Sequence, residues 1–268
     1  MKNIAEELKA RGIEPIEIDE KTDCENRVKE INEIKGDLKD YDCPICKNKG
    51  IVAKAKYEPM YCYHVVETSI CECMKKRQML RKAKNSGLGD YLTKRFDDYI
   101  ATEDWQKGIK TKAIEYCKNS DDKWFIMCGQ SGSGKTIICC IISNYLLHQG
   151  KNVLYITWTD FISKLKRDMM GDNSNNVSDY LEDIKTIEVL YIDELLKKFN
   201  ETDLKYIIEI INYRYTNNLK TIISSERMID ELIDIDEATF GRVIEKSDQY
   251  IINIPKDKKK NYRLKNII

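Results

Sequence analysis

The sequence predicts an α/β fold in which a doubly wound, parallel, five-stranded sheet follows a small N-terminal module. From residue 121 onward, short apolar runs alternate with amphipathic helical patterns, as in a parallel sheet covered by helices on both faces. Six of the ten cysteines fall between residues 24 and 73, where hydrophobic periodicity is weak. A chain of 268 residues is long enough for a sizeable domain plus such a module.

The N-terminal part shows two changes of composition. Residues 1–36 carry two short helical patterns and more acids than bases, which predicts a small helical arm. Residues 41–73 hold five cysteines with Pro44, Gly50 and Pro59. We therefore divide the chain into a helical arm with a cysteine-rich module at 1–73, a basic linker helix at 74–96 and the α/β domain at 97–268.

Five apolar runs are the predicted strands of the sheet. They are "KWFIMC" (123–128), "NVLYIT" (152–157), "IEVLYID" (187–193), "KTIISS" (220–225) and "QYIINI" (249–254). Residues 201–217 predict a helix, because Leu204, Ile207, Ile208, Ile211 and Tyr215 form one apolar stripe. The polar stretch "GDNSNNVSD" (171–179) is interpreted as a surface loop.

Composition excludes several classes of protein. Lys plus Arg equals Asp plus Glu at 45 each, so no net charge attracts the whole chain to nucleic acid or membrane. No apolar run approaches the ~20 residues that span a bilayer, and the first residues lack the pattern of a secretory signal. We expect a cytoplasmic protein without a membrane partner. The cysteines are then expected as reduced thiols or metal ligands, with Cys117, Cys128, Cys139 and Cys140 as buried apolar residues.

The stretch "GQSGSGKT" matches the phosphate-binding pattern GxxxxGKT between a predicted strand and a predicted helix. Glycines let the backbone amides turn toward the β-phosphate, Lys135 reaches the β- and γ-phosphates, and the Thr136 hydroxyl holds Mg²⁺. The alternative is an ordinary glycine-rich turn. The residues expected to bind nucleotide are Gly129, Gln130, Ser131, Gly132, Ser133, Gly134, Lys135 and Thr136.

A second strand, "VLYIDE", ends in two carboxylates. Asp193 is expected to hold Mg²⁺ together with Thr136, and Glu194 to polarise the water that attacks the γ-phosphate. The alternative for Glu194 is a helix cap at "ELLKK".

The cysteine module predicts a zinc site. "CPIC" supplies Cys43 and Cys46, and "CEC" supplies Cys71 and Cys73 after a 24-residue excursion. Four thiolates form the tetrahedron that structural zinc prefers, and the metal can fold a segment that is poor in apolar residues. Cys62 and His64 are alternative ligands that the sequence does not exclude. A redox role for CPIC is disfavoured, because no strand and helix flank it as in thioredoxin-like folds.

The segment 74–96 carries eight basic residues against one acid. Such a run can meet DNA phosphates with a strong dependence on salt, or it can be a solvated linker helix. Both interpretations remain open at this point.

Five segments together resemble the AAA+ ATPase domain of the DnaC/DnaI family of helicase loaders, which is related to IstB transposition helpers. They are "WFIMCGQSGSGKT", "YIDEL", "INYRYTNNLKTIISSE", "IDEATFGRV" and "NYRLK", and the resemblance covers about residues 88–268. It implies that residues 97–268 are an AAA+ domain that hydrolyses ATP with Mg²⁺.

The resemblance also implies roles for single residues. Ser225 is similar in position to the sensor 1 residue near the γ-phosphate, but Glu226 replaces the family's usual asparagine. Arg242 matches the arginine that enters a neighbouring subunit's site, with a surface ion pair to Glu245 as the alternative. Arg263 is a weaker match to the sensor 2 arginine, and Arg214 stays unassigned.

The function implied by the resemblance is an ATP-dependent helicase loader in DNA replication. Its N-terminal module is expected to bind a replicative DnaB-type hexameric helicase, and its AAA+ domain to bind single-stranded DNA, with self-association through that domain. ATP hydrolysis is expected to be slow and stimulated by DNA or a partner. The alternatives are a nucleotide-responsive adaptor or helicase inhibitor with little turnover, and an IstB-like transposition ATPase, which generally lacks a cysteine module.

Overall fold

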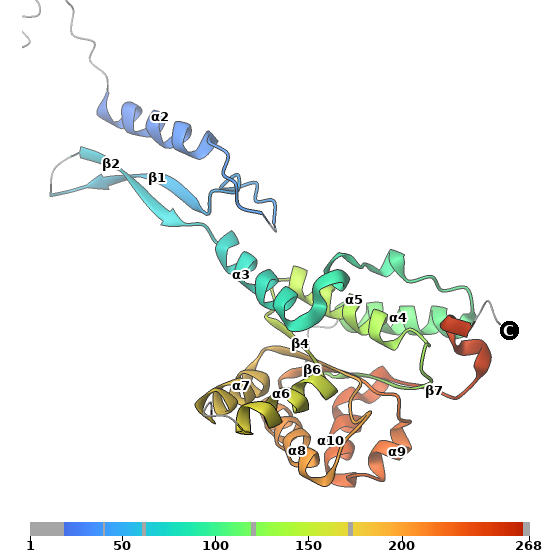
Figure 1. Cartoon of the computed structure of the whole chain (residues 1–268). Helices are drawn as coiled ribbons and strands as arrows, with labels where there is room; N and C mark the ends of the chain where they lie inside the picture. Colours follow the sequence, from blue (N-terminus) through green and yellow to red (C-terminus); the bar gives the residue numbers. More distant parts are fainter. Residues whose placement is uncertain (1–18, 40, 61–62, 119–121, 171–173, 265–268) are drawn as a thin grey trace, which may run out of the picture. The chain divides into compact units, whose positions relative to one another are not determined.

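The computed structural model describes residues 19–39, 41–60, 63–118, 122–170 and 174–264 (Figure 1). The chain divides into two compact units, Met1–Gln78 and Met79–Ile268. Each unit has its own sheet, of two strands in the first unit and five in the second. Within the described ranges, no helix is both long and apolar enough to cross a membrane.

In the N-terminal unit, a helix packs against an antiparallel hairpin. The helix is α2 (Glu20–Glu33), and the strands are β1 (Ile51–Glu58) and β2 (Tyr63–Ile70). The Asn32 amide exchanges two hydrogen bonds of 2.9 Å with the backbone of Ala53, which fixes the helix to the sheet. The second helical pattern of the predicted arm is therefore confirmed as a helix, while the first lies outside the described residues.

This unit has a very small apolar core. Its described side chains that are apolar and buried are Cys24, Cys43, Cys46, Ala53, Cys71 and Cys73. A core made almost entirely of thiols and one alanine buries too little apolar area to hold a domain of this size together. Some further source of stability is needed in this unit.

The basic segment is only partly helical. Helix α3 (Cys73–Ala83) is followed by a π-helical turn at Lys84–Leu88 and a 3-10 turn at Gly89–Thr93. Gly87, with φ of 103°, interrupts the helical path. Arg77 is buried, and its Nη2 donates to Tyr41 O at 2.5 Å and to Asn48 Oδ1 at 2.7 Å. This arginine therefore supports the N-terminal unit and cannot contribute to a DNA-binding surface.

The sheet of the C-terminal unit has the order β4-β5-β6-β3-β7, and every neighbouring pair is parallel. Its strands are β3 (Phe125–Gly129), β4 (Val153–Thr157), β5 (Val189–Asp193), β6 (Lys220–Ser224) and β7 (Ile251–Ile254). All five predicted strands are confirmed to within two residues. Since the strands are parallel, the carboxyl ends of β3, β5 and β6 meet at one edge of the sheet.

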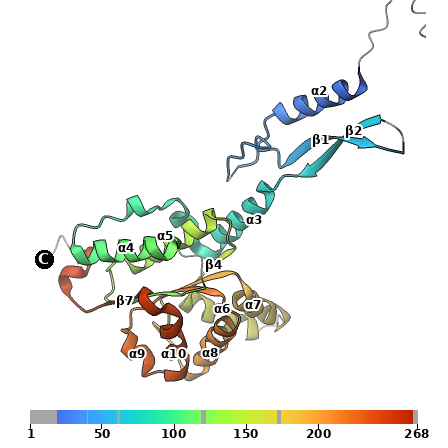
Figure 2. The ribbon, with the colours of Figure 1, turned by 180° about the vertical axis from the view of Figure 1, so that it is seen from behind.

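Helices cover both faces of this sheet, as Figures 1 and 2 show from opposite sides. Helices α4 (Asp104–Lys118) and α5 (Lys135–His148) lie on one face. The other face carries α6 (Trp158–Met170), α7 (Ser174–Thr186), α8 (Glu201–Thr216), α9 (Ile229–Ile233) and α10 (Glu237–Ser247). Each face has its own apolar cluster, and Cys117, Cys128, Cys139 and Cys140 are buried in these clusters as expected.

The segment 171–179 also differs from its prediction. Helix α7 begins at Ser174, inside the stretch 171–179 that was interpreted as a surface loop. The polar residues occupy the first turn, and the helix is held by Val177, Tyr180, Leu181 and Ile184, which pack on the core. The predicted helix at 201–217 is confirmed as α8.

Arg214 is a structural residue within α8. Its guanidinium is fully buried, and it donates five hydrogen bonds. The acceptors are Ile184 O, Lys185 O, Ile187 O, Lys220 O and Thr221 Oγ1. Arg214 thereby ties the end of α7 to the start of β6, and it makes no contact with the phosphate-binding motif.

We expect Arg214→Lys to destabilise the C-terminal unit by about 3 kcal/mol, because an ammonium group cannot reach this spread of acceptors and leaves buried carbonyls unpaired. Urea unfolding followed by tryptophan fluorescence measures this unit alone, since Trp105, Trp124 and Trp158 all belong to it. Arg167→Lys, at an exposed position of α6, is the control. Equal stability of the two variants would contradict this role for Arg214.

Candidate functional site

The phosphate-binding motif forms a loop between β3 and α5. Its glycines at 129 and 132 have φ values of 100° and 73°, which side-chain-bearing residues rarely adopt. A Cβ at Gly129 would lie 2.1 Å from Ile254 O, and one at Gly132 would lie 2.1 Å from Asn261 Oδ1. Conformation therefore requires glycine at both positions, and the fixed backbone of Ile254 leaves no room for a side chain at Gly129.

Lys135 begins α5 and folds back over this loop. Its Nζ donates to Gly129 O and to Gln130 O, each at 2.8 Å. The side chain is buried, and this burial lowers the pKa of Lys135 from its usual value. The ammonium is thus already held above the loop, where it can meet phosphate oxygens.

Asp193, at the carboxyl end of β5, is the buried carboxylate of the site. Its Oδ1 accepts from Thr136 Oγ1 at 3.2 Å and from Ser224 Oγ, and its Oδ2 accepts from Tyr155 Oη at 3.1 Å. The structure therefore brings together the hydroxyl and the carboxylate that were expected to share Mg²⁺. Oxygen ligands of this kind suit that cation.

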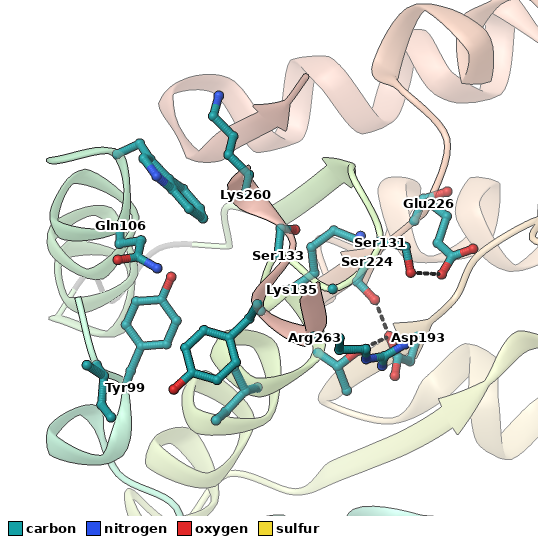
Figure 3. A pocket seen from close by; sticks show the side chains of 18 of the residues that line it. Tyr99, Gln106, Ser131, Ser133, Lys135, Asp193, Ser224, Glu226, Lys260 and Arg263 are labelled. Carbon is teal, nitrogen blue, oxygen red and sulfur yellow. Dashed lines mark hydrogen bonds between the residues drawn. The ribbon is translucent and has the colours of Figure 1, made fainter. Parts of the chain in front are cut away.

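Glu194 follows Asp193. It lines a cavity that is also lined by the phosphate loop and Asp193. Its φ is 54°, an unusual value for a residue with a side chain, and its Oε1 lies 2.7 Å from Lys197 Nζ. The residues after it form turns, so the alternative of a helix cap at "ELLKK" is wrong. Figure 3 shows the neighbouring residues of this cavity.

The end of β6 differs in detail from the expectation for Ser225. The Ser225 hydroxyl is buried and donates to Leu195 O at 2.8 Å, whereas Ser224 contacts Asp193. Glu226 accepts a 2.9 Å hydrogen bond from Ser131 Oγ of the phosphate loop. Partial burial alone would raise the pKa of Glu226, but this hydrogen bond and the Lys197 ammonium outweigh it and lower that pKa.

The two other predicted arginines lie in different places. Arg263 lines the cavity, next to a C-terminal segment whose Tyr262 N donates to Gly132 O at 2.8 Å. Arg242, on α10, does not line it, and its Nη1 donates to Ala238 O at 2.9 Å. The Glu245 carboxylate accepts from Tyr215 Oη at 2.9 and 3.0 Å, and among the described ion pairs there is none between Arg242 and Glu245.

The cavity has a volume of about 320 Å³, and part of its lining was missed by the sequence reasoning. The phosphate loop forms part of the lining. Other lining residues come from outside the motif, and they include Tyr91, Tyr99, Ile100, Trp105, Gln106 and Tyr262. Most of these residues belong to the segment before the motif, where the aromatic residues of "YLTKRFDDYIATEDW" were the available signal.

The candidate metal centre lies in the N-terminal unit. Cys43, Cys46, Cys71 and Cys73 are all buried, and their sulfur atoms lie within 4.8 Å of one another. Cys43 Sγ is 3.9 Å from Cys71 Sγ, and Cys46 Sγ is 3.4 Å from Cys73 Sγ. A tetrahedron with Zn–S bonds of about 2.3 Å has edges of about 3.8 Å, so the four sulfur atoms fit zinc.

The surroundings of these thiols favour metal binding. The Gly50 amide donates to Cys46 Sγ at 3.3 Å, as amides commonly do to metal-bound thiolates. Burial raises the pKa values of Cys71 and Cys73, whereas at Cys46 the hydrogen bonds from the Gly50 amide and the neighbouring thiols outweigh burial and lower the pKa to about 6. Of the alternative ligands, His64 is not in the cluster and packs against Tyr57, and Cys62 lies outside the described residues.

Comparison with known proteins identifies relatives. Residues 59–244 match the protein family described as "IstB-like ATP binding protein". The uncharacterized protein YqaM of Bacillus subtilis is 26% identical over 276 residues, which cover 84% of this chain and 86% of YqaM. The replicative helicase loader DnaC of Escherichia coli K12 is 33% identical over 119 residues, which cover 44% of this chain and 47% of DnaC.

Solved structures support the fold. The crystal structure of the DnaC helicase loader has a TM-score of 0.55 at 20% identity, and the match covers 61% of this chain and 99% of that one. The replication initiator DnaA bound to AMPPCP and single-stranded DNA has a TM-score of 0.52 at 18% identity, covering 64% and 54%. Because the family match spans most of the chain and includes the phosphate loop, this protein belongs to the IstB/DnaC-like family of AAA+ ATP-binding proteins.

Proposed function

We propose that this protein is an ATP-dependent helicase loader that acts in cytoplasmic DNA replication. The N-terminal unit binds a replicative, DnaB-type hexameric helicase, the AAA+ unit binds single-stranded DNA, and ATP hydrolysis is the switch between states. The observation that carries this proposal is the joining of a complete phosphate loop and its Thr136–Asp193 pair to a four-cysteine module in one chain. The relatives named replicative helicase loader support it.

In this proposal, each residue around the phosphate loop has a separate role in ATP hydrolysis. Lys135 binds the β- and γ-phosphates, and Thr136 and Asp193 hold Mg²⁺, which neutralises phosphate charge. Glu194 orients and polarises the attacking water after its carboxylate leaves Lys197. Ser225, which directly follows β6, and Arg263, in the C-terminal segment, sense the nucleotide.

Arg242 acts in a different molecule from the one that carries it. It lies half-exposed on α10 and does not line the cavity of its own chain. An arginine in such a place can stabilise the transferring phosphoryl group of a neighbouring subunit. Hydrolysis would then depend on self-association through the AAA+ unit.

Zinc takes over the stabilising role of an apolar core in the N-terminal unit. Cys43, Cys46, Cys71 and Cys73 hold it, and the Arg77 guanidinium beside Cys73 offsets part of the negative charge of four thiolates. The metal supplies folding energy and no chemistry. The surface that meets the helicase is therefore formed only when the metal is bound.

A second candidate is a nucleotide-responsive adaptor or helicase inhibitor with little turnover. The contact of Glu226 with Ser131 favours it, because an ionised carboxylate beside the phosphate loop opposes the γ-phosphate. A third candidate is an IstB-like transposition ATPase, to which the family description points. Duplex DNA binding without affinity for a helicase would support that third candidate.

We expect purified protein to hydrolyse ATP slowly and faster with single-stranded DNA. Lys135→Ala should weaken ATP binding by at least about tenfold, because charge-assisted hydrogen bonds to the phosphates are lost, and should abolish hydrolysis. Phosphate release and binding of a fluorescent ATP analogue measure the two effects. Lys151→Ala, at an exposed lysine beyond the other end of the sheet, is the matched control. Full turnover by Lys135→Ala would disprove the assigned site.

We expect Glu226→Gln to raise ATP affinity about fivefold and ADP affinity less, since the removed charge lies nearest to the γ-phosphate. The lowered pKa of Glu226 keeps it ionised at neutral pH, so the wild-type charge is present in the assay. Titration calorimetry measures both affinities, with Glu237→Gln, an exposed acid on α10, as control. Turnover that appears only in the Glu226 variant would identify the wild-type chain as the adaptor.

We expect one zinc ion per chain, lost in Cys46→Ser and retained in Cys24→Ala, whose thiol is buried outside the cluster. Elemental mass spectrometry measures the metal, and pull-down with a purified hexameric helicase measures binding. Cys46→Ser should lose both the zinc and the binding to the helicase, because the module unfolds without its metal. Zinc loss in Cys62→Ala or His64→Ala instead would show that one of these alternatives is a ligand.

A further inference from the structure

Tyr155, on β4, contacts Asp193 but does not line the nucleotide cavity. Its Oη donates to Asp193 Oδ2 at 3.1 Å and accepts from Thr157 Oγ1 at 3.2 Å. The other carboxylate oxygen, Oδ1, accepts from three different groups. Within the described part of the chain, Tyr155 is the one donor to Oδ2, so its hydroxyl helps to set the orientation of the carboxylate.

The ring of Tyr155 also contacts the turn that follows the linker helix. This turn, Lys84–Leu88, is named the linker turn. A Cβ at Gly87 would lie 3.1 Å from Cε1 and 3.2 Å from Cδ1 of Tyr155. The approach is close enough that any side chain at Gly87 would have to displace the ring.

The linker turn is anchored in the C-terminal unit. Ala83 and Leu88, at its two ends, are fully buried in the apolar cluster on the α4–α5 face. A few residues later, Lys94 O accepts from Asn144 Nδ2 of α5 at 2.8 Å. The chain enters this unit through α3 and the linker turn, so a change in that connection reaches Tyr155 directly.

We propose that Tyr155 is a positioning residue that couples the linker turn to the binding of Mg²⁺–ATP at Asp193. With the linker turn in place, the hydroxyl holds Asp193 in the orientation that a metal ligand needs. A displaced linker turn moves the ring and frees the carboxylate. Because such coupling is reciprocal, the linker turn is held more firmly when Mg²⁺–ATP is bound. This inference rests on the proposed nucleotide binding and adds its regulation by the linker.

Three substitutions separate this coupling from backbone strain. Gly87→Ala places a Cβ against the Tyr155 ring at a positive φ of 103°. Gly150→Ala is the matched control, because Gly150 has a φ of 85° and nothing lies within 4 Å of its Cβ position. Tyr155→Phe keeps the ring and removes only the hydroxyl.

Calorimetry on the full chain measures the affinity for AMPPNP, an ATP analogue that resists hydrolysis, with and without Mg²⁺. Tyr155→Phe should weaken binding of Mg²⁺–AMPPNP about tenfold and leave binding of the metal-free analogue unchanged. Gly87→Ala should weaken binding of Mg²⁺–AMPPNP about threefold, and should have no further effect in a Tyr155→Phe chain. In that chain the displaced ring carries no hydroxyl for Asp193.

Hydrogen exchange of residues 84–88 is the second measurement. Mg²⁺–AMPPNP should slow this exchange in the wild type more than in Tyr155→Phe. The coupling is overturned by wild-type affinity in Tyr155→Phe, by equal losses in Gly87→Ala and Gly150→Ala, or by an undiminished effect of Gly87→Ala in the Tyr155→Phe chain. Each of these results leaves nucleotide binding intact, whereas a wild-type chain that binds no AMPPNP overturns the proposed function as well.

Discussion

The hydrogen bonds to the Asp193 carboxylate are the interactions on which the rest of the site depends. Through Thr136, Tyr155 and Ser224, this one side chain joins α5, β4 and β6 at the edge of the sheet. A buried charge is costly unless it is paired or well hydrogen-bonded. The donors around Asp193 offset that cost, and they hold the phosphate loop at a fixed distance from the neighbouring strands.

Strictly local patterns made much of this protein predictable from its sequence. The strands are short apolar runs buried on both faces, and the phosphate loop is a contiguous motif whose glycines and lysine have fixed roles. Asp193 could be placed because parallel strands end at the same edge. Cys43, Cys46, Cys71 and Cys73 could be grouped as one metal site because they are close in sequence, in a segment with too few apolar residues to form a core.

The remaining features depend on contacts between distant segments. Gln106 reaches the cavity because α4 packs on α5, and no residue spacing in the sequence predicts that contact. The hairpin of β1 and β2 was missed because much of it is exposed on both faces, so polar and apolar residues do not alternate along its strands. Arg77 looked like part of a basic surface, yet its guanidinium is buried among the carbonyls of residues 39 and 41. Charge alone does not distinguish a solvated arginine from a structural one.

The contact between Asn261 and Gly132 changes how the motif itself should be understood. In GxxxxGKT, position 132 is one of the variable letters, so alanine or serine would satisfy the pattern. Here a Cβ at that position would collide with Asn261, which follows the last strand of the sheet. Two unrelated segments therefore meet at one variable position of the motif: its left-handed backbone already favours glycine, and a side chain there would also displace the amide of Asn261.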